Sequence, residues 1–453
     1  MKRLFTYLVV LLLPVMHVVA VGNVLYVSTD GTGDGSSWAN ASSLTAAADA
    51  ARAMEVKPEI WVKKRTYVFT DSINFDYLLI YGGFNGDETA LNERNWATNV
   101  TIFDGNNVHS LLRNSIGTGR AGGNATSILS ILDGVIVQNG LSPSANNGGA
   151  MIINNGAIVR NCIFRNNATQ NTKHGAAIHC NNGTNLVIEN CLFTNNTSVG
   201  NGGAIQIGGG TTITVRSCTF ANNSAVKGGA FCAALDASSN MNLYNSVAYN
   251  NLHGTDYQSY SGNGGVNKGG TIISKNSAVE GTSTKFTNGD DVNHIVLSRT
   301  VVPGFVSPAT IIGKGANETE ITEINNASYR LLKTSPCVDK GLNSEATVEN
   351  IPYDLDHTTR IFADYVDMGA YECVYEPNAI SSPSDANFKA NTVNNELRVS
   401  GALKGEKLQL FDMQGKLLET VVITEDNEIA KFRLLNRGVY LVAAHNKLIK
   451  VNY

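Results

Sequence analysis

The chain has 453 residues, enough for two or three ordinary domains. Only 16% of the residues are charged and 44 are glycine, which disfavours a helical protein because glycine is a poor helix former. The net charge is -4, and no basic run is longer than the three residues Lys63 to Arg65, so nucleic-acid binding has no electrostatic support.

The first 20 residues have the pattern of an export signal. Lys2 and Arg3 precede an apolar run that ends in small residues at position 20. A membrane anchor is the alternative, but the run is short for a span and Pro14 and His17 interrupt it. We therefore expect residues 1–20 to be a cleaved signal peptide. The mature chain would have no transmembrane span and would be secreted or held at the outer cell surface.

A weak calcium-binding pattern follows the signal. Asp30, Thr32 and Asp34 have the spacing of the start of an oxygen-ligand loop. The twelfth position, where a bidentate glutamate is expected, holds Ala41. A glycine-rich turn is therefore the alternative interpretation. Apart from this Ca²⁺, we expect no cofactor.

A helix is predicted over residues 43–56, because this Ala-rich stretch starts at a serine cap and ends before Pro58. Short apolar segments that are typical of strands follow it at 60–62, 79–81 and 101–103. Their irregular spacing indicates coils that come before the regular repeat. The helix would cover the first of these coils.

A repeat dominates the middle of the chain. An asparagine recurs at steps of 27 to 29 residues, at Asn139, Asn166, Asn195, Asn222 and Asn250. A Gly-Gly-Ala marker or a close variant keeps the same spacing, at 148–150, 175–177, 202–204 and 228–230. Such a period indicates one supersecondary unit stacked on itself. Because asparagine tolerates left-handed backbone angles, we expect the repeated asparagines at tight bends, with their amides stacked along the axis.

Apolar rows accompany the repeat and are predicted to face inward. The first row is Leu132, Val159, Ile188, Val215 and Leu243. The second row is Val137, Phe164, Phe193, Phe220 and Ala248. Cys162, Cys191 and Cys218 share a register between them and are predicted to stack as small buried hydrophobes. Three short strands and tight bends per coil predict an all-β right-handed parallel β-helix over residues 21–373, with the helix as its N-terminal cap.

The repeat resembles known families. GGAIQI followed by CTFANNSA is similar to the repeats of polymorphic outer-membrane proteins and of pectate-lyase-like β-helices. The opening LYVSTDGTGDGSSWANA and the strings SPCVDKGLN, DLDHTTR and DMGAYE resemble secreted bacterial β-helix proteins of the choice-of-anchor Q type. That family usually has glycine after the second aspartate of DLD, where this chain has His357, which weakens the case for a turn-bound ion. The resemblance implies a fold rather than an activity.

A separate module is predicted at the C-terminus. Residues 374–390 are rich in Pro, Ser and Asn and are predicted to be a linker. Residues 391–453 alternate in short strands, which predicts a small Ig-like β-sandwich. LQLFDMQGKLL and LLNRGVYLVAA resemble the C-terminal sorting domain of type IX secretion. That resemblance implies the secretion machinery as a partner. An ordinary adhesive sandwich domain is the alternative.

The remaining cysteines include a candidate disulfide. Cys337 and Cys373 lie outside the stacked register. In an exported protein they have two alternatives, a disulfide between them or two free thiols. No spacing of Cys or His in the chain supports a zinc site.

The ionisable residues of the repeat bear on two kinds of catalytic site, a hydrolase site and a lyase site. Within the repeat, Asp133, Glu189 and Asp236 are predicted to lie in different registers, which disfavours a hydrolase with paired carboxylates. A lyase needs a base and a cationic group, and His174, His179 and Lys227 are the candidates. His179 is predicted to face outward. Polar residues on a solvated face are the alternative interpretation.

An insertion at 252–263 interrupts the repeat and provides candidate ligand-binding residues. These are His253, Asp256, Tyr257 and Tyr260. Aromatic and polar groups on a loop over a sheet suit sugar binding, although a decorating loop is the alternative. We therefore expect a surface β-helix that binds a polysaccharide or a host-matrix ligand, as an adhesin would, without catalysis. A uronic-acid lyase and a structural surface-layer component are the alternatives.

Overall fold

The structure is a computed structural model that describes residues 24–114, 130–142, 146–154, 156–181, 184–233, 239–257, 260–262, 271–281, 286–287, 294–346, 351–362, 364–374, 389–393, 396–402, 404–412, 416–425, 428–433, 439–444 and 447–452. The chain divides into two compact units, Met1–Cys373 and Val374–Tyr453. The predicted signal peptide at 1–20 and most of the predicted linker at 374–390 lie outside the described residues.

Three parallel sheets form the first unit, and we name them A, B and C. Sheet A contains β1 (Val24–Val27), β2 (Glu59–Lys63), β5 (Leu79–Phe84), β8 (Ser130–Asp133), β11 (Ala157–Arg160), β14 (Asn185–Glu189), β18 (Thr212–Arg216), β22 (Asn240–Tyr244), β27 (Thr271–Lys275) and β29 (Phe286–Thr287), in that order. Sheet B contains β3 (Arg65–Val68), β6 (Thr101–Asp104), β9 (Ile136–Gln138), β12 (Ile163–Arg165), β15 (Leu192–Thr194), β19 (Thr219–Ala221), β23 (Val247–Tyr249), β28 (Ala278–Glu280) and β30 (Ile295–Leu297).

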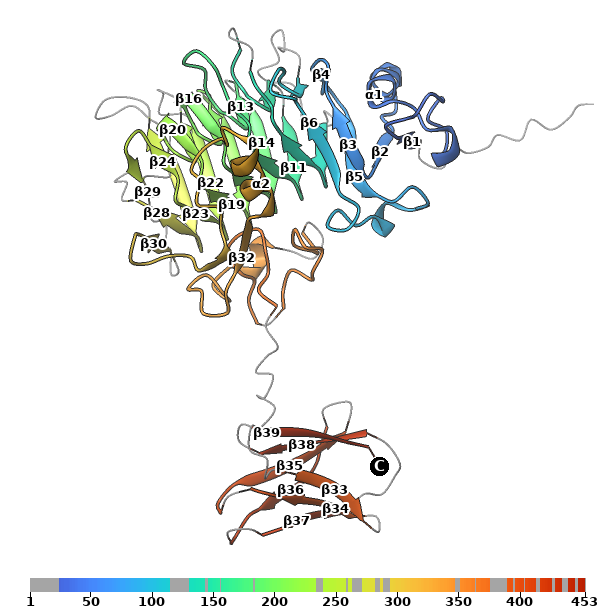
Figure 1. Cartoon of the computed structure of the whole chain (residues 1–453), viewed down its shortest axis with the longest axis vertical. Helices are drawn as coiled ribbons and strands as arrows, with labels where there is room; N and C mark the ends of the chain where they lie inside the picture. The colour runs from blue at the N-terminus through green and yellow to red at the C-terminus, as the bar shows by residue number, and fades with distance from the viewer. Residues whose placement is uncertain are drawn as a thin grey trace, which may run out of the picture. The chain divides into compact units, whose positions relative to one another are not determined.

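Sheet C contains β4 (Ile73–Asn74), β7 (Leu112–Arg113), β10 (Met151–Ile153), β13 (Ile178–Cys180), β17 (Ile205–Ile207), β21 (Phe231–Ala233) and β26 (Tyr260–Gly262). A smaller sheet adds β16 (Thr197–Asn201), β20 (Ser224–Lys227), β24 (Leu252–His253) and β25 (Asp256–Tyr257). Successive coils contribute neighbouring strands to each sheet, as the stacked arrows of Figure 1 show. The unit is therefore all-β with large parallel sheets, an arrangement consistent with a β-helix solenoid.

The repeat places its apolar rows in the core, as predicted. Leu132, Val159, Ile188, Val215 and Leu243 are all fully buried on sheet A, and so is the second predicted row on sheet B. Within the second row, the rings of Phe164, Phe193 and Phe220 stack at centroid separations of 4.9 and 4.8 Å, with interplanar angles of 4° and 5°. The cysteine register is buried beside them. One residue per coil therefore builds each column of the core.

The repeated asparagines lie at bends with left-handed backbone angles, φ being between 54° and 58° at all five positions. Their amides connect neighbouring coils at two steps, from Asn166 to Asn139 at 2.6 Å and from Asn250 to Asn222 at 2.8 Å. Asn195 instead donates to the carbonyls of Ile311 and Gly313. Amide stacking at this position is therefore interrupted by a segment from later in the chain.

A continuous asparagine ladder lies one residue further along. It consists of Asn167, Asn196, Asn223 and Asn251, all fully buried. The Nδ2 atoms of Asn167, Asn196 and Asn223 each donate to the Oδ1 of the asparagine in the next coil at 2.9 Å. The same Oδ1 atoms accept the backbone N–H of the preceding coil's asparagine, at 3.0 to 3.1 Å. The ladder satisfies polar groups that the bend would otherwise leave unpaired in the interior.

Helix α1 (Leu44–Ala53) lies at the N-terminal end of the strand stack (Figure 1). Ser43 caps it by accepting the N–H of Ala46 at 3.2 Å. The helix buries Leu44, Ala47, Ala48 and Ala51 in the same core as the sheets. The short 3₁₀ helices are η1 (Trp38–Asn40), η2 (Leu91–Glu93) and η3 (Asn343–Glu345).

Residues 303–373, which we call the return segment, pack against the outer face of sheet B. The segment contains β31 (Phe305–Ser307), α2 (Glu318–Asn326) and β32 (Ser328–Leu331). Tyr329 and Tyr371 bury themselves with Leu192 of β15 in one apolar cluster. The carbonyl of Asp354 accepts the indole N–H of Trp96 at 3.3 Å, so the segment reaches back to the early coils. Much of this face of sheet B is therefore covered by the chain itself.

The second unit has two antiparallel sheets. One contains β33 (Lys389–Val393), β34 (Glu396–Ser400) and β37 (Ala430–Arg433), and the other contains β36 (Leu417–Val422), β35 (Lys407–Asp412), β38 (Val439–Ala444) and β39 (Lys447–Asn452). Leu397, Leu408 and Phe432 are fully buried in a core shared by both sheets. Throughout the described parts of the chain, no helix combines the length and the apolar character that a membrane crossing requires.

Candidate functional site

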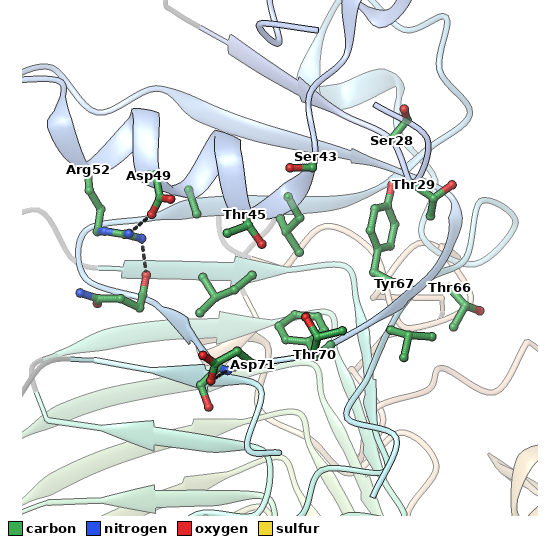
Figure 2. A pocket seen from close by; sticks show the side chains of 17 residues that line it. Ser28, Thr29, Ser43, Thr45, Asp49, Arg52, Thr66, Tyr67, Thr70 and Asp71 are labelled. Carbon is green, nitrogen blue, oxygen red and sulfur yellow. Dashed lines mark hydrogen bonds and ion pairs between the residues drawn. The ribbon is translucent and has the colours of Figure 1, made fainter. Parts of the chain in front are cut away.

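A polar groove of about 630 Å³ lies beside α1 (Figure 2). Its volume falls within the range of roughly 300 to 1,000 Å³ that is usual for small-molecule sites. Five of its 17 lining residues are apolar, and eight carry hydroxyls, namely Ser28, Thr29, Ser43, Thr45, Thr66, Tyr67, Thr70 and Ser72. Asp49, Arg52, Asp71 and Asn74 add carboxylate, guanidinium and amide groups. The arrangement offers many hydrogen-bond donors and acceptors within one concave surface.

The two walls of the groove follow from amphipathic patterns. Helix α1 buries Leu44, Ala47, Ala48 and Ala51, which leaves Thr45 and Asp49 exposed on another side. Strand β3 and the residues after it alternate in the same way, with Tyr67 and Phe69 buried while Thr66 and Thr70 stay exposed. In Figure 2, Thr45 of the helix points toward the segment that carries Thr70, whereas Thr66 lies on the far side of Tyr67 from the helix.

Internal contacts fix several groups in the groove. Arg52 forms an ion pair with Asp49, and its Nη1 donates to the carbonyl of Asn74 at 2.9 Å. The hydroxyl of Tyr67 donates to the carbonyl of Lys63 at 2.9 Å. Burial raises the pKa of Tyr67, so its phenol stays neutral. The groove is thus a surface whose charged and phenolic groups are held in place by contacts within the protein.

The sequence did not indicate this groove. The sequence predicts only a covering role for the helix, and none of the candidate residues named from the sequence lines the groove. The available signals were the exposed polar stripe of the helix and the alternation in TYVFTDS. Neither pattern states that the two faces oppose each other, because that depends on how α1 packs on the first coil.

His174 has a structural partner on each neighbouring coil. Its backbone N–H donates to Asn147 Oδ1 at 3.1 Å, and its Nδ1 accepts the N–H of Asn201 at 2.9 Å. The imidazole thus occupies the position that an asparagine amide holds one coil earlier. Burial, with a smaller effect of the charge on Lys173, lowers the pKa of His174.

His179 lies on β13 in register with Ile152 and Gln206, as predicted, and this row lies outside the main core cluster, but it is buried rather than solvated. Its Nε2 is 3.2 Å from Asn147 Nδ2 and 3.0 Å from Asn181 Oδ1. Burial lowers the pKa of His179 to about 4. Its Nδ1 finds no partner among the described residues. The prediction of an exposed histidine on a solvated face was therefore wrong.

Lys227, the third lyase candidate, is half-buried on β20 and pairs in register with Asn201. Burial lowers the pKa of His253, and the charge of Lys227 lowers it by a smaller amount. Lys227 thus lies near the insertion.

The acidic residues of the repeat share a row, contrary to the prediction. Asp133 and Glu189 lie in one register of sheet A, with Arg160 of the intervening coil between them. Arg160 pairs with Asp133 at 2.6 Å, and Arg216 pairs with Glu189 at 3.2 Å. Burial opposes ionisation of Asp133, but Arg94 and Arg160 hold its pKa below the usual range. The row is an alternating charge ladder, and Asp236 lies outside the described residues.

The insertion folds back on itself. His253 of β24 pairs with Asp256 of β25 in an antiparallel hairpin, and Asp256 is exposed. The Nδ1 atom of His253 accepts the N–H of Gly228 at 3.4 Å. Tyr260 belongs to β26 and pairs with Phe231 in sheet C. The side chains of Tyr257 and Tyr260 lie outside the described residues.

Neither a protein-family model nor a curated protein matches this chain. The candidate site is therefore argued from its own residues.

The predicted calcium loop is a turn held by its own side chains. Asp34 Oδ1 accepts the N–H of Ser36 at 2.9 Å and the amide of Asn40 at 2.5 Å. Within the described parts of the chain, no group of three or more acidic, histidine or cysteine side chains is arranged to hold a metal ion. Calcium binding by Asp30, Thr32 and Asp34 stays a prediction.

The seven cysteines are free thiols, so the structure contains no disulfide between Cys337 and Cys373. Cys337 is buried, and Cys373 is half-buried against the same apolar cluster. Burial raises the pKa of the Cys337 thiol to about 12, which keeps it protonated and unreactive. Pairing of the two under oxidising conditions stays a prediction.

Proposed function

We propose that this chain is a secreted, surface-displayed protein that binds glycan in the groove beside α1 without cleaving it. The observation that carries the proposal is the groove's lining of eight hydroxyl-bearing side chains together with the amide of Asn74. Sugars present hydroxyls that both donate and accept, and a concave surface with many such groups suits them. Thr45, Thr66 and Thr70 stand exposed along its walls.

The finer description of the fold belongs to the same proposal. The stacked parallel sheets support a right-handed parallel β-helix, because parallel crossovers are almost always right-handed. Burial of the α1 alanines in the common core supports its role as the N-terminal cap. The two antiparallel sheets of the second unit support an Ig-like sandwich.

Surface display rests on sequence patterns at both ends. The run at 2–20 has the character of an export signal, and the strings around Asp412 and Gly438 resemble the type IX sorting domain. We propose that secretion machinery recognises this second unit and that the β-helix acts outside the cell. Mass spectrometry of cell fractions tests this. The β-helix should be recovered at the surface or in the medium, and an intact chain confined to the cytoplasm or periplasm contradicts the proposal.

The hydrogen-bond and ion-pair partners of the described ionisable groups support binding without catalysis. His174 accepts a backbone hydrogen bond, and the carboxylates of Asp133 and Glu189 are paired with arginines. To test the function, purified protein is applied to a glycan array and is incubated with uronic-acid polysaccharides, with and without Ca²⁺. We expect retention of glycans and no new absorbance from unsaturated products. Product absorbance would favour the lyase, and blank glycan and host-matrix panels would favour a structural surface-layer role.

A further inference from the structure

We propose that the groove beside α1 selects uncharged glycans and rejects uronic acids. This inference rests on the proposed function and specifies the ligand class of the same site. It concerns the charges that a bound sugar would meet, and these charges belong to three lining residues, Asp49, Arg52 and Asp71.

The one cation in the lining is already paired. Arg52 forms an ion pair with Asp49, three residues before it on the helix, and it also donates to the carbonyl of Asn74. A uronate carboxylate would have to compete with Asp49 for this guanidinium. A neutral sugar faces no such competition, because its hydroxyls can add to the paired groups as donors or acceptors.

The remaining charge is negative. Asp71 is exposed in the lining, and its Oδ1 accepts the N–H of Ser72 at 2.7 Å. Since Asp49 and Arg52 cancel, the lining carries one net negative charge. Beside the groove, Asp30 raises and Arg65 lowers the pKa of Tyr67, so charges of both signs lie nearby. A carboxylate on the ligand would be repelled.

Two nearby positive features do not reverse this balance. Lys57 Nζ donates to the carbonyls of Ala51, Arg52 and Met54 at the end of α1, at 3.3, 2.8 and 2.5 Å. The N-terminus of α1, whose dipole favours anions, has its Ala46 N–H accepted by the Ser43 hydroxyl at 3.2 Å. The ammonium of Lys57 and the N–H of Ala46 are therefore hydrogen-bonded within the protein.

Calorimetry tests the selectivity with neutral cello-, manno- and xylo-oligosaccharides and with an oligogalacturonate of equal length. We expect a neutral oligosaccharide to bind more tightly than the galacturonate. Asp71→Asn should raise the galacturonate affinity about fivefold at low salt, as expected for removing one like charge a few ångströms away in water. Any effect on neutral binding should be smaller and independent of salt, whereas the gain for galacturonate should disappear in about 1 M salt because of screening.

Asp87→Asn is the matched control, because Asp87 is also exposed but does not line the groove. It should leave both affinities unchanged, and melting curves should show both variants folded. Equal binding of galacturonate and neutral sugars, with no effect of Asp71→Asn, overturns the selectivity and leaves glycan binding intact. Failure of every sugar to bind overturns both the selectivity and the function on which it rests.

Discussion

Asn167 and Asn196 are linked twice across neighbouring coils. The Nδ2 and the backbone N–H of Asn167 both donate to Asn196 Oδ1, at 2.9 and 3.1 Å. The Nδ2 of Asn196 in turn donates to the carbonyl of Phe164 at 3.0 Å. Both residues are fully buried. The bend of each coil is therefore held by the side chain of the next one, with no access to water.

Asn196→Ala should destabilise the first unit by about 2 to 4 kcal/mol, because it leaves at least two buried donors of Asn167 unsatisfied. The free energy of unfolding, measured with urea, checks this. Asn242→Thr is the control, since Asn242 is half-buried on sheet A and Thr214 holds its register one coil earlier. The control should change stability by no more than about 0.5 kcal/mol. Equal effects of the two variants would refute the structural role of the ladder.

His179 should make stability depend on pH below neutrality. Its pKa is about 4 in the folded chain and 6.5 ordinarily, so the unfolded chain binds a proton first as the pH falls. Stability should be lost between pH 6.5 and 4, by up to about 3 kcal/mol at the rate of 1.4 kcal/mol per pKa unit. Urea unfolding at pH 7 and pH 5 measures this loss.

His179→Gln is the informative variant, because Gln206 occupies the same register in the next coil. It should remove most of this pH dependence while keeping the fold. A variant that loses stability as steeply as the wild type between pH 7 and pH 5 would show that other groups are responsible.

A buried acidic cluster should produce the opposite slope. Asp354, Asp367 and Glu372 surround the buried Arg360 in the return segment. Burial, opposed by Arg360, raises the pKa of Glu372 above its ordinary 4.5. The unfolded chain therefore releases this proton first, and stability contributed by the group is lost as the pH rises through the folded pKa.

Glu372→Gln should accordingly weaken the loss of stability between pH 5 and pH 8. The slope should not vanish, because burial also raises the pKa of Asp354 and Asp367. Urea midpoints at the two pH values give the comparison. An unchanged or steeper slope in the variant would mean that Glu372 is ionised in the folded protein throughout this range.

His357 occupies a left-handed backbone position, with φ of 61°, which glycine adopts without strain. Its ring stacks on Tyr353 at 4.2 Å and meets the edge of Trp96 at 4.6 Å. His357→Ala should cost about 1 kcal/mol, since it loses the ring contacts and keeps the strain. His357→Gly should be less destabilising, because it relieves the strain. Thermal unfolding of the two variants decides, and a more stable alanine variant would contradict this account.

The core could be predicted because every coil repeats it. Phe164, Phe193 and Phe220 recur at one register, and a period of 27 to 29 residues leaves little freedom in how such coils stack. The alternation of side chains along the strand predicts that the row of His179 faces outward, but it does not predict that this row is buried. Counting residues along the repeat places Asp133 and Glu189 in one register, so the prediction that they lie in different registers was wrong.

The return segment and the groove depend on long-range packing. Trp96 and Asp354, for example, meet across 258 residues of sequence, and no periodic pattern links them. The groove requires α1 to lie across β3 and β4. The apolar stripe of α1 does not determine the direction in which the helix crosses these strands. The sequence alone therefore indicates only that Thr45, Asp49 and Thr66 are exposed, and it does not indicate that they line one groove.

Glycan binding by the wild type and by the double variant Thr66→Ala, Thr70→Ala tests the central claim most directly. Both threonines are exposed in the groove, so their loss should leave the melting temperature unchanged. Thr300→Ala, an exposed threonine outside the lining, is the control. We predict that calorimetry shows a neutral oligosaccharide bound by the wild type and the control, and about tenfold or more weaker binding by the double variant. Equal binding by all three proteins, or none by the wild type, would contradict the proposal that this groove is the glycan site.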